Sequence, residues 1–181
     1  MATFLLSLIV FLPALAALML AICPGTVDEE QQSRRNDLFR ISTLVVTIAV
    51  FGLTIFTFFV LPETSFNTSA GEMQNVFNAS WIPSFNIDYY MGIDGISFPL
   101  IMLTALISML AMAASWSIKK HVKGYCILFL LLETGMLGVF LSLDFFLFYV
   151  FWEVMLLPMA LMIGVWGGPR RIYAAVKFVL F

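Results

Sequence analysis

The sequence predicts an all-α integral membrane protein, a polytopic helix bundle, and three observations carry that prediction. Of its 181 residues, 62% are hydrophobic and only 11% are charged, so a water-soluble fold would lack the polar side chains to cover its surface. Five apolar segments are each about 20 residues long, which is the length that crosses a hydrocarbon core of about 30 Å. The basic residues alternate strictly between the loops that join these segments.

The predicted complete spans cover residues 4–23, 41–61, 96–116, 124–143 and 145–166. A sixth apolar helix begins near Ile172, but the chain reaches Phe181 after about ten residues, or about 15 Å of helical rise. That length cannot cross a bilayer, so we expect this sixth helix to be truncated and residues 1–181 to be the N-terminal part of a larger membrane subunit.

The loops separate by basic charge. The first, third and fifth loops hold all the loop lysines and arginines, which are Arg34, Arg35, Arg40, Lys119, Lys120, Lys123, Arg170 and Arg171. Because basic residues concentrate on the cytoplasmic side, this alternation places the N-terminus outside and residues 62–93 in an outer-face loop between the second and third helices. In that loop the alternation through Phe85, Ile87 and Tyr89 permits a short strand. We expect a multi-pass protein of a bacterial inner (plasma) membrane.

Composition also excludes several functions. The net charge of -2 provides no polycationic face for nucleic acid, and no glycine-rich phosphate loop is present. Cys23 and Cys126 lie in different apolar runs without the spacing of a zinc or iron–sulfur site, and His121 in "KKHVK" suits a solvated loop. The sequence therefore predicts no metal site and no cofactor-binding site in this chain.

Three ionisable residues lie within the apolar helices: Glu133, Glu153 and Lys177. A charge at such a depth costs several kcal/mol on insertion scales, so each must be neutral, partnered or in contact with water. Glu133 and Glu153 each lie about ten residues from the tight turn near Leu143, which predicts similar depths in an antiparallel pair of helices. Whether the two carboxyl groups face each other stays open.

We interpret Glu153 as a proton relay. Pro158 has no N–H, so the carbonyl of Val154 beside the glutamate loses its usual donor, and the carboxylate and carbonyl could together hold water. Glu133 fits a relay and a helix–helix hydrogen bond near the close-packing glycines of "ETGMLG" equally well. Lys177 is expected to extend toward the cytoplasm, with a water-bridged link to the relay left open.

Asp94 and Asp144 stand at predicted helix starts, where a carboxylate accepts backbone N–H groups and complements the positive end of the helix dipole. We therefore assign both to structural capping.

The segments "GIDGISFPLIMLTALI" (92–107), "WIPSFNIDYY" and "FLFYVFWEVMLLPM" together resemble the antiporter-like chain M family (the ND-four counterpart) of proton-pumping NADH:quinone oxidoreductase, respiratory complex I. The likeness covers essentially the whole sequence. It implies a subunit of the translocase with roughly fourteen spans built around two inverted repeats. It further implies that this chain has no redox centre, and that NADH, FMN, iron–sulfur clusters and quinone bind to partner subunits. Neighbouring antiporter-like chains and the lipid bilayer are the other implied partners.

In that family a glutamate of the fifth span pairs with a lysine of the seventh. Glu153 matches this glutamate through "FWEVMLLPM", and the resemblance places its lysine partner after Phe181. Glu133 and Lys177 have no such counterpart. Two other functions remain: a subunit of an Mrp-type cation/proton antiporter, or a non-transporting membrane scaffold in which Glu153 is merely hydrogen-bonded. "DGIS" and "VFWEVMLLPM" together favour complex I.

Overall fold

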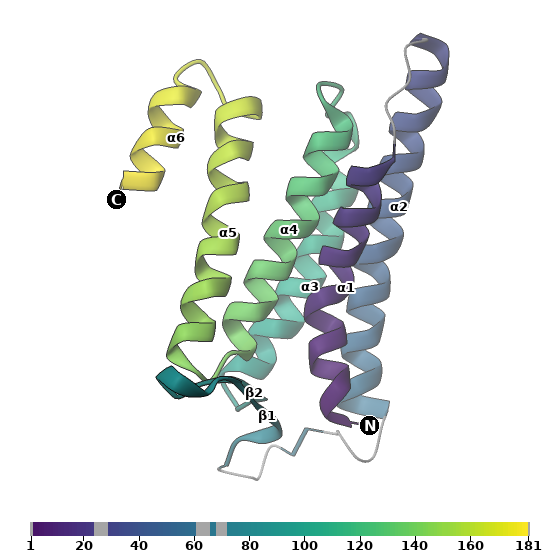
Figure 1. Cartoon of the computed structure of the whole chain (residues 1–181). Helices are drawn as coiled ribbons and strands as arrows, with labels where there is room; N and C mark the ends of the chain where they lie inside the picture. The colour runs from purple at the N-terminus through teal and green to yellow at the C-terminus, as the bar shows by residue number, and fades with distance from the viewer. Residues whose placement is uncertain (1, 24–28, 61–65, 68–71, 181) are drawn as a thin grey trace.

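The computed structural model describes residues 2–23, 29–60, 66–67 and 72–180. Its helices are α1 (Ala2–Ile22), α2 (Glu29–Ile55), α3 (Ser97–Ala114), α4 (Val122–Leu141), α5 (Phe145–Trp166) and α6 (Arg171–Leu180). A π-helical turn, Phe56–Val60, continues α2, and two strands, β1 (Gln74–Ile82) and β2 (Ile87–Ile93), precede α3. The chain is therefore mostly helical, with one small sheet (Figure 1).

All five predicted spans are helices long and apolar enough to cross a membrane, namely Phe4–Ile22, Gln32–Phe59, Ser97–Ser117, Val122–Leu141 and Phe145–Trp166. The helix of the second span begins at Glu29, well before the predicted start at residue 41. Hydropathy could not detect this extension because its residues are polar, but Glu, Gln and Arg are good helix formers. The span itself agrees with the prediction.

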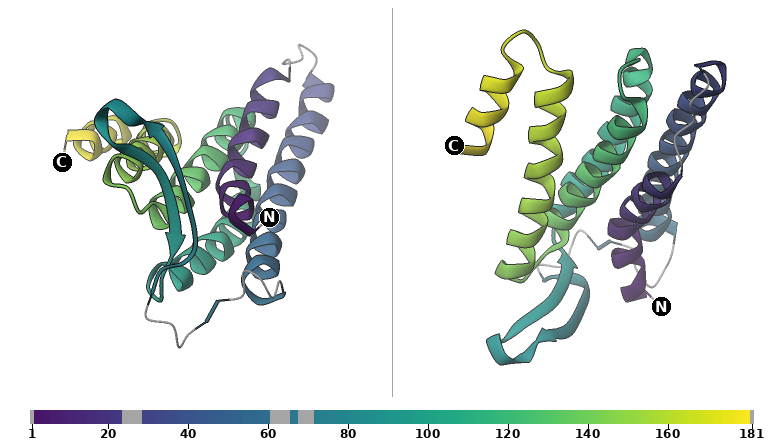
Figure 2. Two further views of the ribbon diagram at one scale, coloured as in Figure 1. Left: turned by 60° about the horizontal axis from the view of Figure 1, so that its bottom comes forward. Right: turned by 45° about the horizontal axis from the view of Figure 1, so that its top comes forward.

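Consecutive helices run in alternating directions, and α1 to α4 form a compact group (Figure 1). α5 packs along α4, and α6 packs on the far side of α5, so α5 and α6 form one edge of the bundle in both views of Figure 2. At the end of α5, the indole N–H of Trp166 donates to the carbonyl of Lys120, 2.7 Å away. This hydrogen bond joins α5, hereafter the edge helix, to the loop between α3 and α4.

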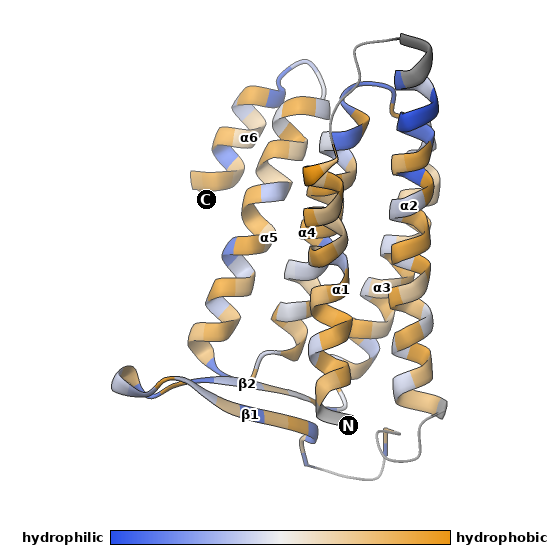
Figure 3. Cartoon of the chain, turned by 45° about the vertical axis from the view of Figure 1, so that its right-hand side comes forward, coloured by the Kyte–Doolittle hydropathy of each residue, from blue (hydrophilic) through white to orange (hydrophobic). Residues whose placement is uncertain are grey.

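The loop basic residues gather at one end of the bundle, hereafter the basic end. Figure 3 shows hydrophilic residues at the start of α2 and at the connections beside α4 and α5, with hydrophobic residues dominating the helices between the two ends. The N-terminus and the two strands lie at the opposite end, hereafter the hairpin end (Figure 1). This separation agrees with the alternation of basic loops in the sequence.

The strands form an antiparallel hairpin across the hairpin end of the bundle (Figure 1). Asn86 adopts a left-handed conformation with φ 54° at the turn. The predicted short strand corresponds to β2, whereas β1 was not predicted. Most of the side chains of β1 are exposed and lack strict alternation, so only pairing with β2 defines it as a strand. Residues 62–65 and 68–71 of the predicted outer loop, and residue 61 at the end of the predicted second span, lie outside the described residues.

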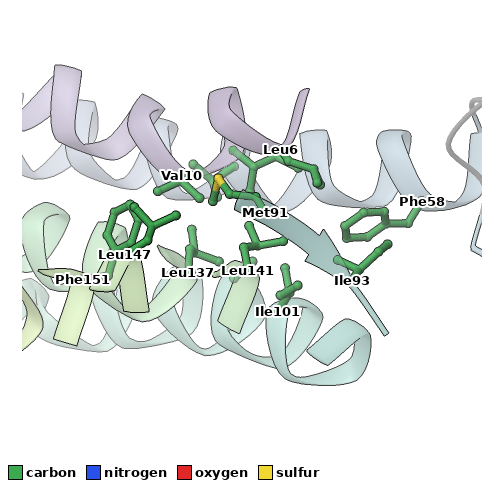
Figure 4. Packing of buried hydrophobic residues seen from close by; sticks show 13 residues of the cluster. Leu6, Val10, Phe58, Met91, Ile93, Ile101, Leu137, Leu141, Leu147 and Phe151 are labelled. Atoms are coloured by element: carbon green, nitrogen blue, oxygen red, sulfur yellow. The ribbon is translucent and has the colours of Figure 1, made fainter. Parts of the chain in front are cut away.

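The hairpin is joined to the helices at its inner end. Met91 and Ile93 of β2 are fully buried, and in Figure 4 Met91 lies close to Leu6 and Ile93 lies close to Phe58. The N–H of Leu143, in the turn between α4 and α5, donates to the carbonyl of Tyr90 at 2.8 Å. Together these contacts fix the hairpin against the α4–α5 turn.

Two hydrophobic clusters form the interior. The larger, at the hairpin end, comprises the buried residues Leu6, Ile9, Val10, Val50, Phe58, Met91, Ile93, Ile101, Ala105, Leu137, Leu141, Leu147 and Phe151 (Figure 4). The smaller, at the basic end, comprises Phe39, Met112, Val122, Tyr125, Cys126 and Phe129. Along α4, Glu133 lies between the residues that belong to the smaller cluster and those that belong to the larger one, and its side chain is fully buried.

Candidate functional site

Glu153 lies on the exposed side of the edge helix α5. Its neighbours Phe151 and Met155 pack against α4, because a Cβ on Gly138 would overlap the Phe151 ring and a Cβ on Gly135 would lie 2.8 Å from that of Met155. At about 100° per residue, Glu153 therefore points about 180° away from α4. The hydroxyl group of Tyr149, one turn earlier on the same side, lies beside the Glu153 carboxylate.

Glu133 has the opposite environment. Its side chain is 0% exposed, and neither carboxyl oxygen has a hydrogen-bond partner among the described residues. Gly135 and Gly138 mark the side of α4 that faces α5, and Glu133 lies about 170° around the helix from it. The fully buried acid among the described residues is thus Glu133, whereas the sequence placed both glutamates at similar depths and favoured Glu153 as the relay.

The question that the sequence left open is answered by this geometry: the two carboxyl groups point in opposite directions and do not face each other. Their depths are similar but not equal. The contacts of Gly135 with Met155 and of Gly138 with Phe151 bring Glu133 level with residue 156 of α5, about three residues or about 5 Å nearer the basic end than Glu153.

Pro158 is buried on the same side of α5 as Leu147 and Phe151, which is the side that meets α4. It lies about 140° around the helix from Glu153. The proline ring and the glutamate therefore occupy different sides of α5, and the pairing of the carboxylate with the freed Val154 carbonyl stays a prediction.

Lys177 is an exposed residue of α6, whose Ala175 packs 3.6 Å from the position of a Cβ on Gly164 of α5. This contact brings Lys177 level with residue 162, about nine residues or about 13 Å nearer the basic end than Glu153. The two side chains start from different depths, as the sequence suggested, and Lys177 lies near the end that carries the loop arginines and lysines.

Asp94 and Asp144 both accept hydrogen bonds from backbone N–H groups at helix starts. Asp144 Oδ1 accepts from Phe146 at 2.8 Å and Leu147 at 3.0 Å. Asp94 Oδ1 accepts from the N–H of Ser97 at 2.6 Å, and the Ser97 hydroxyl accepts from the N–H of Asp94. The hydrogen bonds from the Ser97 backbone and hydroxyl hold the pKa of Asp94 below its usual value.

No cluster of three or more His, Cys, Asp or Glu side chains that could hold a metal ion occurs within the part of the chain that the structure describes. The buried Cys126 thiol lies beside the hydroxyl group of Thr43 of α2, which donates to the carbonyl of Phe39 at 2.8 Å.

Five spanning helices with carboxyl groups inside two of them define a polytopic membrane protein of the class that carries ionisable groups within the bilayer. The family model for NADH-ubiquinone oxidoreductase chain 4, amino terminus, matches residues 36–144. The chain belongs to this family, as its motifs suggested.

Relatives and solved structures agree. The chain is 40% identical over 177 residues to NADH-quinone oxidoreductase subunit M of Rhodobacter capsulatus, covering 98% of this chain and 32% of that one. It superposes on a chain of respiratory complex I from Thermus thermophilus with a TM-score of 0.73 and 26% identity, covering 100% of this chain and 32% of that one. It therefore spans about a third of the length of these relatives.

A similar fold occurs in the Mrp complex from Dietzia sp., with a TM-score of 0.70 and 21% identity, covering 99% of this chain and 17% of that one. At this identity the likeness concerns the fold alone. The arrangement of helices is thus shared between complex I and Mrp-type assemblies, and the fold by itself does not separate the two functions.

Proposed function

We propose that residues 1–181 form the N-terminal part of a proton-translocating membrane-arm subunit of NADH:quinone oxidoreductase, in which Glu153 is a proton relay. The observation that carries the proposal is the position of Glu153, on the side of α5 that points away from α4. The family to which the chain belongs, and relatives named as subunit M, support the choice of complex.

Glu153 needs a partner from beyond these helices. Exposed apolar side chains, including Trp152 and Leu157, surround it on α5. An unpartnered carboxylate among them would be costly in lipid, so this side of α5 suits contact with further protein or with a hydrated path. The family resemblance supplies a candidate partner, a lysine of the seventh span.

The mechanism is electrostatic. An ionised Glu153 stabilises a protonated amine nearby, and separating or neutralising the pair releases that proton. A change of about 2.7 kcal/mol in their interaction alters the proton equilibrium about 100-fold. Electron transfer in partner subunits that bind NADH, FMN, iron–sulfur clusters and quinone would drive the change, in a bacterial inner membrane with neighbouring antiporter-like chains beside this one.

The test is Glu153→Gln in the full-length subunit, assembled in its complex in inverted membrane vesicles. We expect NADH-driven proton uptake to fall by about tenfold or more, since the charge that holds the proton is lost. NADH oxidation by an artificial electron acceptor, which bypasses the membrane arm, should be unchanged, and the amount of the variant subunit in the purified complex reports assembly. Glu72→Gln, at an exposed glutamate before β1, is the matched control and should pump normally.

Two results would overturn the proposal. Full proton uptake by the Glu153→Gln vesicles would leave the scaffold function, with the Glu153 carboxylate simply packed beside Tyr149. Sodium-dependent proton exchange without NADH, together with NADH oxidation that does not depend on this protein, would identify the Mrp-type antiporter function instead.

A further inference from the structure

A layer of polar side chains separates the two hydrophobic clusters of the interior. On each of three neighbouring helices, a buried polar residue lies between the residues of the larger cluster and those of the smaller one. These positions, hereafter the polar layer, are Thr47 of α2, Ser108 of α3 and Glu133 of α4. A polar interruption on three adjacent helices at the centre of an otherwise apolar core is costly unless its groups are satisfied.

Ser108 and Glu133 lie at the same height. The hydroxyl groups of Ser115 and Tyr125 are hydrogen-bonded at 2.7 Å, which sets the register of the antiparallel helices α3 and α4. Because the helices are antiparallel, counting seven residues back from Ser115 on α3 and seven residues on from Tyr125 on α4 gives Ser108 and residue 132. Ser108 and Glu133 therefore differ in height by about one residue, or about 1.5 Å. Both face the interior, with Ser108 2% exposed and Glu133 0% exposed.

Thr47 completes the layer from α2. The side chains of Thr43 and Cys126 lie beside each other, and α2 and α4 run in the same direction, so Thr47 lies about three residues or about 4.5 Å from the height of Glu133. Its hydroxyl already donates to the carbonyl of Leu44 at 2.9 Å within its own helix. Thr47 therefore leaves the carboxyl group of Glu133 without a donor.

The hydroxyl oxygen of Ser108 and both carboxyl oxygens of Glu133 have no hydrogen-bond partner among the described residues. Each such buried group costs about 1–3 kcal/mol if it stays unsatisfied. Two unsatisfied groups at one height, on adjacent helices, point to a small ligand that bonds to both of them. Water has this capacity, since a buried molecule commonly makes about three hydrogen bonds to polar groups of this kind.

The charge balance decides the form of the acid. The sequences of α1 and α3, and of α2 after Arg40, contain no titratable residue. The remaining titratable groups described on α4 and on the elements packed against it lie away from Glu133: Arg34, Arg35, Asp37, Arg40, Lys123, Tyr125 and Cys126 toward the basic end, Asp88, Tyr89, Tyr90 and Asp144 at the hairpin end, and Tyr149 and Glu153 on the far side of α5. Arg40 is level with residue 123, about 15 Å away. Without a cation facing it, burial favours the neutral acid.

We propose that Glu133 and Ser108 form a proton-binding site in which a bound water bridges the neutral carboxyl group and the serine hydroxyl. The carboxyl O–H donates to the water oxygen, and the water donates to Ser108 Oγ. The site lies on the opposite side of α4 from α5, so it is separate from Glu153 and does not depend on the role proposed for that residue.

Infrared spectroscopy of the full-length subunit in its membrane complex tests the proposal. The difference spectrum between wild type and Glu133→Gln should contain the carbonyl stretch of one protonated carboxyl group at neutral pH. In deuterated buffer this band should shift to lower frequency, because exchange of the bridging water with solvent replaces the carboxyl proton with deuterium. In Ser108→Ala it should move to higher frequency, because the bridging water loses a partner.

Thr104→Val is the matched control for Ser108→Ala. Thr104 lies one turn away on α3, and its hydroxyl donates to the carbonyl of Leu100 at 2.7 Å, so its loss should not move the band. Absence of a protonated carboxyl band, or a band that neither exchanges nor responds to Ser108→Ala, would overturn the site. If Glu133→Gln fails to assemble, the difference between wild type and Ser108→Ala still reports the shift. None of these readouts involves NADH oxidation, so the result is independent of the proposed function.

Discussion

Glu133 and Glu153 are the same residue type at similar depths, yet the two helices that carry them give them opposite environments. α4 is surrounded by other elements and buries Glu133 completely, whereas α5 is at the edge and leaves Glu153 exposed beside Tyr149. The position of a carboxylate along a spanning helix therefore does not determine its environment. The number of neighbouring helices and the side of the helix determine it.

The sharpest way to break this comparison is to place a lysine at each position. Glu133→Lys puts an unpaired cation into the interior and should destabilise the full-length subunit by about 3–5 kcal/mol. Glu153→Lys should cost less, because water in the proposed hydrated path screens the repulsion between the new cation and the proposed lysine partner. Thermal unfolding of the purified complex and the amount of assembled subunit measure both, and equal losses would show that the two environments do not differ.

The contact that separates the two environments can be altered next. Gly138→Ala places a methyl group where the Phe151 ring packs, and overpacking of this kind costs about 1–3 kcal/mol. Gly52→Ala on α2 is the matched control, since nothing lies within 4 Å of a Cβ there and stability should hold or rise slightly. The melting temperatures of the two variants give the comparison. A similar melting temperature for both would contradict the close approach of α4 and α5.

The start of the edge helix offers a smaller effect. Asp144→Ala removes the acceptor for two backbone N–H groups and should destabilise the subunit by about 1 kcal/mol, while Asp144→Ser, which retains a capping oxygen, should recover most of it. Denaturation of the three proteins under identical conditions provides the measurement. If the serine variant is no better than the alanine variant, capping does not explain the role of Asp144.

The smallest expected effect concerns the orientation of Glu153. Tyr149→Phe removes the hydroxyl group beside the Glu153 carboxylate, so NADH-driven proton uptake should fall only a few-fold. Tyr173→Phe, on the exposed side of α6, serves as the control and should leave uptake unchanged. A loss as large as that of Glu153→Gln would mean that Tyr149 does more than orient the acid.

Much of this arrangement could be predicted from the sequence. The spans follow from the length of the apolar segments, and the loop charges separate the two ends, because both depend on composition alone. The sequence also indicates which side of α4 packs closely against a neighbouring helix. Gly135 and Gly138 mark the close-packing side of α4, and Glu133 lies opposite them in a helix of 3.6 residues per turn.

Other features depend on contacts that no local pattern encodes. β1 is a strand because β2 pairs with it, and its own residues lack the alternation of a half-buried strand. The offset of about 5 Å between Glu133 and Glu153 reflects how α5 lies along α4, which the length of the turn does not fix. The pairing of Ser108 with Glu133 required the register between α3 and α4 given by Ser115 and Tyr125.

The hydrogen bond from Leu143 to Tyr90, and the bridge between Met91 and Ser142 beside it, constrain the order in which the protein is made. The hairpin leaves the ribosome before α4 and α5, yet its final contacts lie in the turn that joins them. Docking of the hairpin must therefore wait until both helices have been inserted. A pause in synthesis before α5 would leave the strand edge and the buried end of β2 unprotected, which makes this interval the stage of biogenesis most exposed to misassembly.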